Sequence, residues 1–125
     1  GVFYTDASTS KPTFANHLNA SNTATDIVAL VNDSPIQQYE VRSDNASASA
    51  QLDVGNTADI AYTAGVAANY VSRATLDDSS LNANAEQQIK VIGVSRDPEN
   101  NDLTAANVVW RVIINQSFFN DLTGV

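Results

Sequence analysis

The 125-residue chain contains no cysteine, no methionine and a single histidine, His17. Without cysteine it has no disulfides, no thiolate metal ligands and no cysteine nucleophile, but its compartment stays open because secreted and intracellular proteins alike can lack cysteine. No run approaches the roughly 18 apolar residues of a membrane span, and no basic-then-apolar leader opens the chain. We therefore expect a soluble protein that uses no cofactor and holds no metal.

Basic side chains are scarce as well. Six lysines and arginines stand against fourteen aspartates and glutamates, which gives a formal charge of −8 at pH 7, and the six are scattered along the sequence. A chain of this charge repels nucleic-acid phosphates and anionic lipids, so we expect neither nucleic acid nor a membrane as a partner. The same charge favours solubility, which suits a protein exposed in many copies.

Length and composition predict one domain, residues 1–125, that is mainly β. A chain of this size buries well over half of its unfolded surface around a single core. Its many alanine, serine, threonine and asparagine residues favour short strands and ordered loops over long helices. We expect a small antiparallel β-barrel or β-sandwich with long loops and extended terminal arms. Residues 1–24 are the candidate N-terminal arm and residues 117–125 the candidate C-terminal arm.

The strongest strand signals are residues 87–96 and 107–116, which the polar turn 97–102 joins. In the first run, Gly93 predicts a bulge or a close backbone approach. The better apolar face of the second run consists of alternate residues: Val108, Trp110, Val112 and Ile114. Its other face consists of Val109, Arg111, Ile113 and Asn115. We therefore place Trp110 in the core.

Two more strands are predicted earlier in the chain. Residues 25–32 form a near-continuous apolar run, which indicates a strand buried on both faces, and residues 32–35 supply a turn. Residues 36–43 alternate apolar and polar side chains, as a strand with one wet face does. Together these segments predict a hairpin over 25–43.

The middle of the chain, residues 44–85, carries weaker signals. It is rich in small and polar residues with isolated apolar anchors, so we expect short strands and long loops there. One helical turn is predicted after Ser79 or Ser80, since either hydroxyl could cap it.

No group of residues makes a catalytic signature. His17 has Asp26 and several hydroxyls nearby in sequence, but no serine lies in a nucleophile elbow, so we interpret His17 as a loop residue. The oxygen-rich loop 97–102 has the ligand chemistry of a calcium loop, yet it lacks the EF-hand glycine and distal glutamate and is interpreted as a strand-connecting turn. Two carboxylate pairs, Asp77 with Asp78 and Asp53 with Asp59, are interpreted as solvated polar loops rather than as the acid and base of a glycosidase. We expect no enzyme.

Aromatic residues gather near both ends, at Phe3, Tyr4 and Phe14 and at Phe118 and Phe119. One interpretation is local closure of the core by terminal segments. The other is a pair of interface anchors, with residues 1–11 as an arm rather than a strand, because aromatic side chains beside polar loops often contact a neighbour.

Four stretches, in this order and spacing, resemble small virion structural proteins of tailed bacteriophages, notably cyanobacterial and marine phages. They are Asn56–Ile60 (NTADI), Ser72–Ser80 (SRATLDDSS), Ile89–Asn100 (IKVIGVSRDPEN) and Trp110–Asn115 (WRVIIN). The resemblance covers about residues 25–118 and rests on strand and turn patterns. It points to a capsid decoration, or cement, protein.

The resemblance implies a mainly β, non-enzymatic protein on the outer capsid surface of a virion. Its main partner would be the major capsid protein, whose subunits it would bridge, and copies would associate with one another around a capsid symmetry axis. The alternative is a carbohydrate-binding or adhesive β-module on a phage fibre or bacterial surface, which a buried Trp110 would weaken. The candidate interface residues are Phe3, Tyr4, Lys11, Phe14, Arg73, Arg96, Phe118 and Phe119.

Overall fold

The computed structural model describes residues 1–66, 68–83 and 86–117. It is mainly β, and its named strands pair antiparallel, which confirms the predicted fold class at that level. The chain separates into two compact units where the sequence predicted one domain. They are Gly1–Asp33, the N-terminal unit, and Ser34–Val125, the C-terminal unit.

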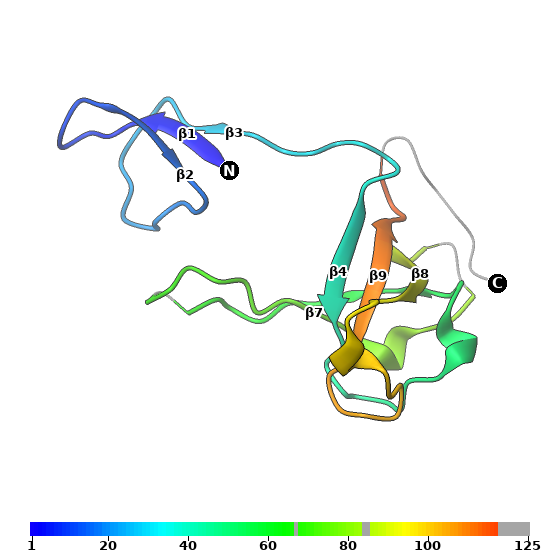
Figure 1. Ribbon diagram of the computed structural model, residues 1–125. Coiled ribbons are helices and arrows are strands. Elements are labelled where there is room, and N and C mark those ends of the chain that lie inside the picture. Colours follow the sequence, from blue (N-terminus) through cyan, green and yellow to red (C-terminus); the bar gives the residue numbers. More distant parts are fainter. Residues whose placement is uncertain (67, 84–85, 118–125) are drawn as a thin grey trace. The chain divides into compact units, whose positions relative to one another are not determined.

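Three short strands form the sheet of the N-terminal unit. β1 (Val2–Thr5) pairs with β2 (Pro12–Ala15) on one side and with β3 (Val28–Ala29) on the other, so the strand order is β2-β1-β3 (Figure 1). The prediction that residues 1–11 form an arm rather than a strand is therefore wrong. Valine, phenylalanine, tyrosine and threonine favour extended backbone, and here that backbone finds strand partners on both of its edges.

The predicted strand over residues 25–32, buried on both faces, is also wrong. Only Val28–Ala29 is a strand, it lies at the edge of the sheet, and every residue from 25 to 32 is exposed. An unbroken apolar run indicates burial on both faces only where other layers cover the sheet. The N-terminal unit provides no such layer over this strand.

A four-stranded sheet forms the body of the C-terminal unit (Figure 1). Its strands β4, β9, β8 and β5 lie in that order and span Gln38–Arg42, Val109–Ile114, Ile89–Val94 and Thr57–Ala58. β8 and β9 form the C-terminal pair that the sequence predicted, and their connection contains the 3-10 turn η3 (Pro98–Asn100). The predicted hairpin over 25–43 is wrong, because β3 pairs with β1 whereas β4 pairs with β9.

Short elements occupy residues 44–85, as predicted. Besides β5 they are η1 (Gln51–Asp53), β6 (Ile60–Ala61), β7 (Thr75–Leu76) and the 3-10 turn η2 (Asp78–Ser80). The predicted helical turn thus exists, but its cap is neither Ser79 nor Ser80. The Asp77 carboxylate accepts a hydrogen bond from the Ser79 N–H at 2.9 Å, and a carboxylate at this position is a strong cap.

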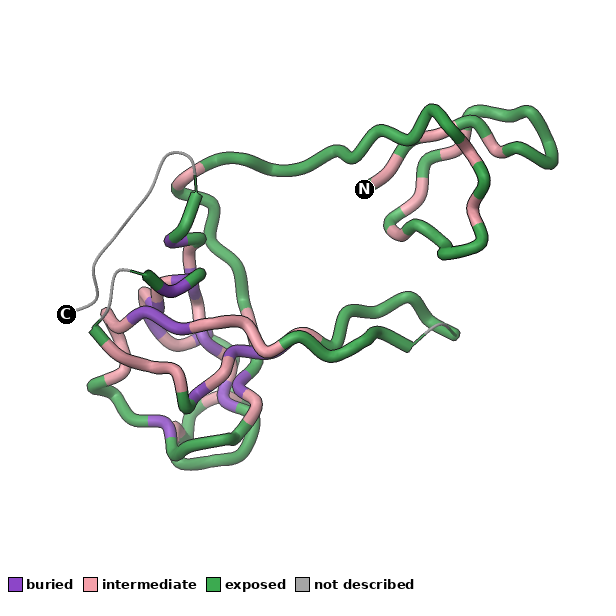
Figure 2. Tube along the Cα trace, turned by 180° about the vertical axis from the view of Figure 1, so that it is seen from behind, coloured by how far each residue is buried: buried purple, intermediate pink, exposed green. Residues whose placement is uncertain are grey.

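The buried apolar residues of the described chain all lie in the C-terminal unit (Figure 2). They are Ala58, Leu76, Ile89, Val91, Val108, Trp110 and Val112. Alternate residues of β8 and β9 point into this core, which is the period of two expected for strands covered on one face. Trp110 is 0% exposed, which confirms its predicted place in the core.

The β8–β9 pair is irregular at Gly93 and at the end of β9. The register shifts between Val91 and Gly93, so the bulge predicted at the glycine is confirmed. A Cβ added to Gly93 would lie 2.9 Å from Nη2 of Arg111. The alternation predicted for the end of β9 is wrong, since Ile114 is exposed and Asn115 is buried. Asn115 follows the last residue of the strand, and its Nδ2 donates to the Gln87 carbonyl at 2.8 Å.

Candidate interaction surfaces

A row of exposed apolar side chains crosses the sheet of the N-terminal unit. Phe3 is paired with Phe14 on β2 and with Val28 on β3, and residues paired directly across strands project from the same face. Leu30, two residues beyond Val28, extends the row, and its N–H donates to the Gly1 carbonyl at 2.8 Å. These residues are 43% (Phe3), 66% (Phe14), 52% (Val28) and 56% (Leu30) exposed. We name the four together the apolar face.

Gly1 fixes the position of one ring on this face. A Cβ added to Gly1 would lie 2.6 Å from a ring carbon of Phe14, so the ring lies directly over the glycine backbone. The observed position of the Phe14 ring on the apolar face therefore requires glycine at position 1.

The other face of the same sheet carries Tyr4, which separates it from Phe3 and Phe14 although the sequence grouped all three. Tyr4 lines a hollow of about 330 Å³ together with residues of the 6–8 turn and the 17–23 loop. Lys11 is exposed in the β1–β2 connection. Phe118, Phe119 and the candidate C-terminal arm beyond residue 117 lie outside the described residues.

Two carboxylates of the N-terminal unit, Asp6 and Asp26, accept hydrogen bonds from backbone N–H groups. The Asp6 carboxylate accepts hydrogen bonds from the hydroxyls and N–H groups of Ser8 and Thr9, and these bonds lower its pKa to about 2. Asp26, the partner considered for His17, instead accepts the Thr5 N–H with both oxygens at 3.0 and 3.1 Å, and contacts with Thr5 lower the pKa of Asp26. Two ionised carboxylates that cap backbone N–H groups make poor general acids.

A second exposed apolar element belongs to the C-terminal unit. Residues 61–75, which we name the ribbon, run out from β6 and return to β7 (Figure 1), with a bridge between Val66 and Val71. Among its described residues, the large apolar side chains that are exposed are Tyr62, Val66, Tyr70 and Val71, and Tyr62 is 83% exposed. Gly65 lets the two sides approach, because a Cβ there would lie 2.9 Å from the Val71 carbonyl oxygen.

The two candidate interface arginines, Arg73 and Arg96, lie in different parts of the C-terminal unit. Arg73 is exposed on the ribbon and is its one charged residue. Arg96 is exposed between β8 and η3, in the connection to β9. Arg73 thus accompanies the exposed tyrosines of the ribbon, an association that the sequence alone did not reveal.

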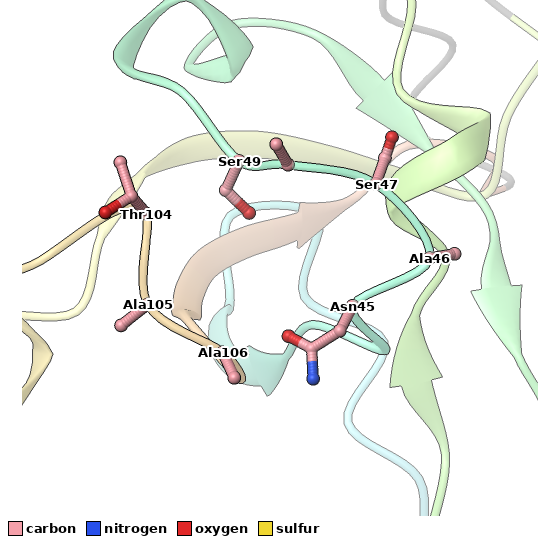
Figure 3. Close-up of a pocket in the computed structure, with 8 residues that line it drawn as sticks. Asn45, Ala46, Ser47, Ser49, Thr104, Ala105 and Ala106 are labelled. Atoms are coloured by element: carbon pink, nitrogen blue, oxygen red, sulfur yellow. The ribbon is translucent and has the colours of Figure 1, made fainter.

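A hollow of about 380 Å³ lies between two loops of the C-terminal unit (Figure 3). Two hydrogen bonds join these loops: Nδ2 of Asn45 donates to Oδ1 of Asn107, and the backbone N–H of Asn107 donates to Oδ1 of Asn45. Both residues have positive φ angles, 62° and 65°. None of the lining residues is ionisable or aromatic, so the hollow offers neither an acid–base pair nor a surface on which a sugar ring could stack. The residues that line the hollow are Asn45, Ala46, Ser47, Ala48, Ser49, Thr104, Ala105 and Ala106.

The Asp78 carboxylate is buried, which the sequence did not predict. The sequence placed Asp77 and Asp78 in a solvated loop, but Asp78 is buried: the Ser43 hydroxyl donates to its Oδ2, and its Oδ1 has no hydrogen-bond partner within the described part of the chain. Burial raises the pKa of Asp78 more than the Ser43 hydrogen bond lowers it, and the nearby Asp44 carboxylate adds to the rise. Asp78 lines neither hollow, so we interpret it as a structural residue.

The described residues bring together no group of three or more histidine, aspartate or glutamate side chains that could hold a metal ion. Over the same residues, no helix has the length and apolar character needed to cross a membrane. Comparison of the chain with models of protein families, with curated proteins and with solved structures finds no match.

Proposed function

We propose that this protein is a non-enzymatic structural component of a phage virion. In this proposal it decorates the outer surface of the capsid and stabilises the shell by bridging subunits of the major capsid protein. The observation that carries the proposal is the ribbon, an exposed apolar element that contributes Tyr62, Val66, Tyr70 and Val71 to the surface rather than to the core.

The composition of the ribbon favours a protein partner. Tyrosine and arginine are enriched at protein interfaces, where the aromatic rings fill pockets and the guanidinium forms paired hydrogen bonds with carboxylates. In a chain with fourteen acidic residues, residues 61–75 contain none and carry Arg73 alone. Contiguous exposed apolar surface often marks a site of contact with another protein.

The remainder of the C-terminal unit supports the role of a scaffold. Its core joins strands β5, β8 and β9 with Leu76 of β7, at the base of the ribbon, so the ribbon projects from a fixed point. A small interface per copy suffices in an array, because contacts repeated around symmetry axes dissociate only when many break together. The acidic surface keeps particles apart and repels stray nucleic acid.

The proposal is tested by titrating the purified protein against expanded capsids that lack it and measuring co-sedimentation. Saturation at a fixed copy number compatible with capsid symmetry is the expected result. Retention on host-cell glycans without capsid binding would instead support the adhesive module. Trp110 is 0% exposed, so its ring offers no surface on which a sugar could stack, which weakens that alternative.

A matched pair of variants locates the contact. Tyr62→Ser combined with Tyr70→Ser should weaken capsid binding about tenfold or more, since truncating an interface aromatic typically costs over 1 kcal/mol. Leu52→Ser is the control, because Leu52 is 87% exposed on η1, away from the ribbon. Equal binding by both variants would place the contact elsewhere on the protein.

A further inference from the structure

The hollow that Tyr4 lines, which we name the Tyr4 hollow, lies wholly within the N-terminal unit. Its volume of about 330 Å³ is at the lower end of the range of small-molecule sites. Its lining includes an aromatic ring, a carboxylate and two amide side chains, which belong to Tyr4, Asp6, Asn19 and Asn22. Neither a ring nor a carboxylate lines the hollow beside Asn45, so the two hollows suit different ligands.

The carboxylate in this lining keeps one oxygen available. Ser8 and Thr9 donate four hydrogen bonds to Oδ1 of Asp6 at 2.6 to 3.0 Å, and no described residue donates to Oδ2. These bonds hold the carboxylate in one orientation and lower its pKa to about 2, so it is ionised at neutral pH. Oδ2 is therefore a charged acceptor, and hydrogen bonds to a charged acceptor are roughly twice as strong as those between neutral groups.

The two amides of the lining keep their donors available. Oδ1 of Asn19 accepts the Ser21 N–H at 3.0 Å, and Oδ1 of Asn22 accepts the Ala24 N–H at 2.8 Å. These bonds hold the oxygen of each amide, while neither NH₂ group donates to a described residue except through water. The loops thus orient both side chains before a ligand arrives, which reduces the side-chain freedom that binding removes.

Tyr4 provides the apolar surface of the hollow. It is half-buried, on the face of the sheet opposite to Phe3. A tyrosine ring presents an apolar body with a polar tip. A hexose in its ring form has the matching character, since its C–H groups line the faces of the ring and its hydroxyls project from the edge.

We infer that the Tyr4 hollow binds one neutral hexose unit, with the Tyr4 ring against a C–H face of the sugar. A hydroxyl donates one hydrogen bond and accepts others. Neighbouring hydroxyls of the sugar can therefore donate to Oδ2 of Asp6 and accept from the NH₂ groups of Asn19 and Asn22. The donors and acceptors left available by the loops are the ones that a pair of hydroxyls requires.

Other classes of ligand fit this lining less well. The Asp6 carboxylate repels an anion, and residues 1–33 carry three aspartates and one lysine, a formal charge of −2. A metal ion lacks ligands, because the described residues hold no group of three or more suitable side chains. A purely apolar ligand would remove water from the Asp6 carboxylate without replacing its hydrogen bonds, which is costly for a charged group.

The size of a hexose sets the expected affinity. A methyl hexoside has about 13 non-hydrogen atoms, and at the efficiency of a drug-sized ligand it binds with a dissociation constant of about 1 mM. Many copies of the site on one particle would raise the avidity for a surface rich in sugars. The inference does not rest on the proposed function, because binding requires the N-terminal unit alone and the ribbon belongs to the other unit.

The experiment is a titration of the ¹⁵N-labelled full chain, followed by amide chemical shifts. The probes are the methyl glycosides of mannose, galactose and glucose, each added to about 20 mM. At least one should shift the amides of residues 4–8 and 17–23 with a saturable dissociation constant of about 1 mM. The matching disaccharides are titrated in parallel: tighter binding assigns the hollow to glycan chains, and equal binding assigns it to free hexoses.

Two pairs of variants locate the sugar. Tyr4→Leu removes the ring and should weaken binding at least about tenfold, whereas Phe3→Leu, the same kind of change on the opposite face of β1, should leave binding unchanged. Asp6→Asn keeps an oxygen for the 6–9 turn but replaces the charged Oδ2, and should weaken binding about fivefold or more. Asp33→Asn removes the same charge from an exposed residue outside the hollow and should have no effect.

Three results would overturn the inference. The first is the absence of any saturable shift with all three hexosides. The second is equal binding by wild type, Tyr4→Leu and Asp6→Asn, which would place the sugar outside the hollow. The third is a shift of residues 4–8 and 17–23 by sulfate or calcium but not by the hexosides, which would assign the hollow to an ion. Failure of the protein to co-sediment with capsids would reject the proposed function and leave these results unaffected, since the titration uses the protein alone.

Discussion

Replacing Trp110 by phenylalanine should cost almost no stability, although Trp110 is fully buried. Its side chain is 0% exposed, and its indole Nε1 lies buried without a hydrogen-bond partner among the described residues. On folding, the N–H loses its hydrogen bonds to water and gains no acceptor among the residues that the structure describes. Phenylalanine keeps most of the ring and removes this group.

The stability that Trp110→Phe loses through reduced apolar burial is similar in size to the stability it gains by removing the unpaired N–H. Trp110→Phe loses roughly 40 Å² of buried apolar surface, or about 1 kcal/mol, and a residual cavity of roughly 30 Å³ adds about 0.7 kcal/mol. Removing a buried unpaired N–H returns about 1 to 3 kcal/mol. The expected net change is within about 1 kcal/mol of zero, whereas Trp110→Ala should cost about 3 to 5 kcal/mol.

The assay is urea unfolding followed by far-ultraviolet circular dichroism, because the substitution removes the chain's one tryptophan and with it the indole fluorescence. Leu76→Ala is the reference variant, since Leu76 is equally buried and its truncation creates a cavity without touching a polar group, at about 2 to 5 kcal/mol. If Trp110→Phe costs as much as Leu76→Ala, the indole N–H is hydrogen-bonded and the reasoning fails.

Two further predictions concern the buried carboxyl of Asp78 and the close backbone approach at Gly65. Burial raises the pKa of Asp78, so its contribution to stability is complete below the unfolded pKa of about 3.9 and is lost as pH rises through the folded pKa. Asp78→Asn should therefore stabilise the protein more at pH 7 than at pH 4, judged by urea midpoints, and an equal effect at both would show that Asp78 keeps an ordinary pKa. Gly65→Ala should accelerate amide exchange in the ribbon, because its Cβ meets the Val71 carbonyl oxygen at 2.9 Å. Gly93→Ala should accelerate exchange in β8 less, because at the same distance its Cβ meets Nη2 at the end of the Arg111 side chain, which is held only through the bond from Nε to the Val94 carbonyl.

The β8–β9 pair was predictable because each strand carries its own signal. Trp110 and its alternate neighbours define one face without reference to any other segment, and the polar turn limits where the hairpin closes. Gly93 was predictable for the same reason, since a glycine within an apolar strand indicates a local irregularity.

The N-terminal unit shows what local patterns miss. Val2–Thr5 and Pro12–Ala15 have the β-prone residues and the intervening turn of a hairpin, so their pairing could have been found from the sequence. The apolar face could not, because it depends on the register that sets Val28 beside Phe3 across 25 residues. Asp78 is buried for a similar reason: its hydrogen-bond partner, Ser43, lies 35 residues away.

The separation of core from exposed apolar residues makes the proposals testable by substitution. Truncating Trp110 should remove several kcal/mol of stability, which would abolish any function through unfolding. Tyr62 is 83% exposed, and surface substitutions usually change stability by less than about 0.5 kcal/mol. A tenfold loss of affinity corresponds to about 1.4 kcal/mol. A loss of that size in a ribbon variant, at an unchanged unfolding midpoint, must therefore come from the contact and not from the fold.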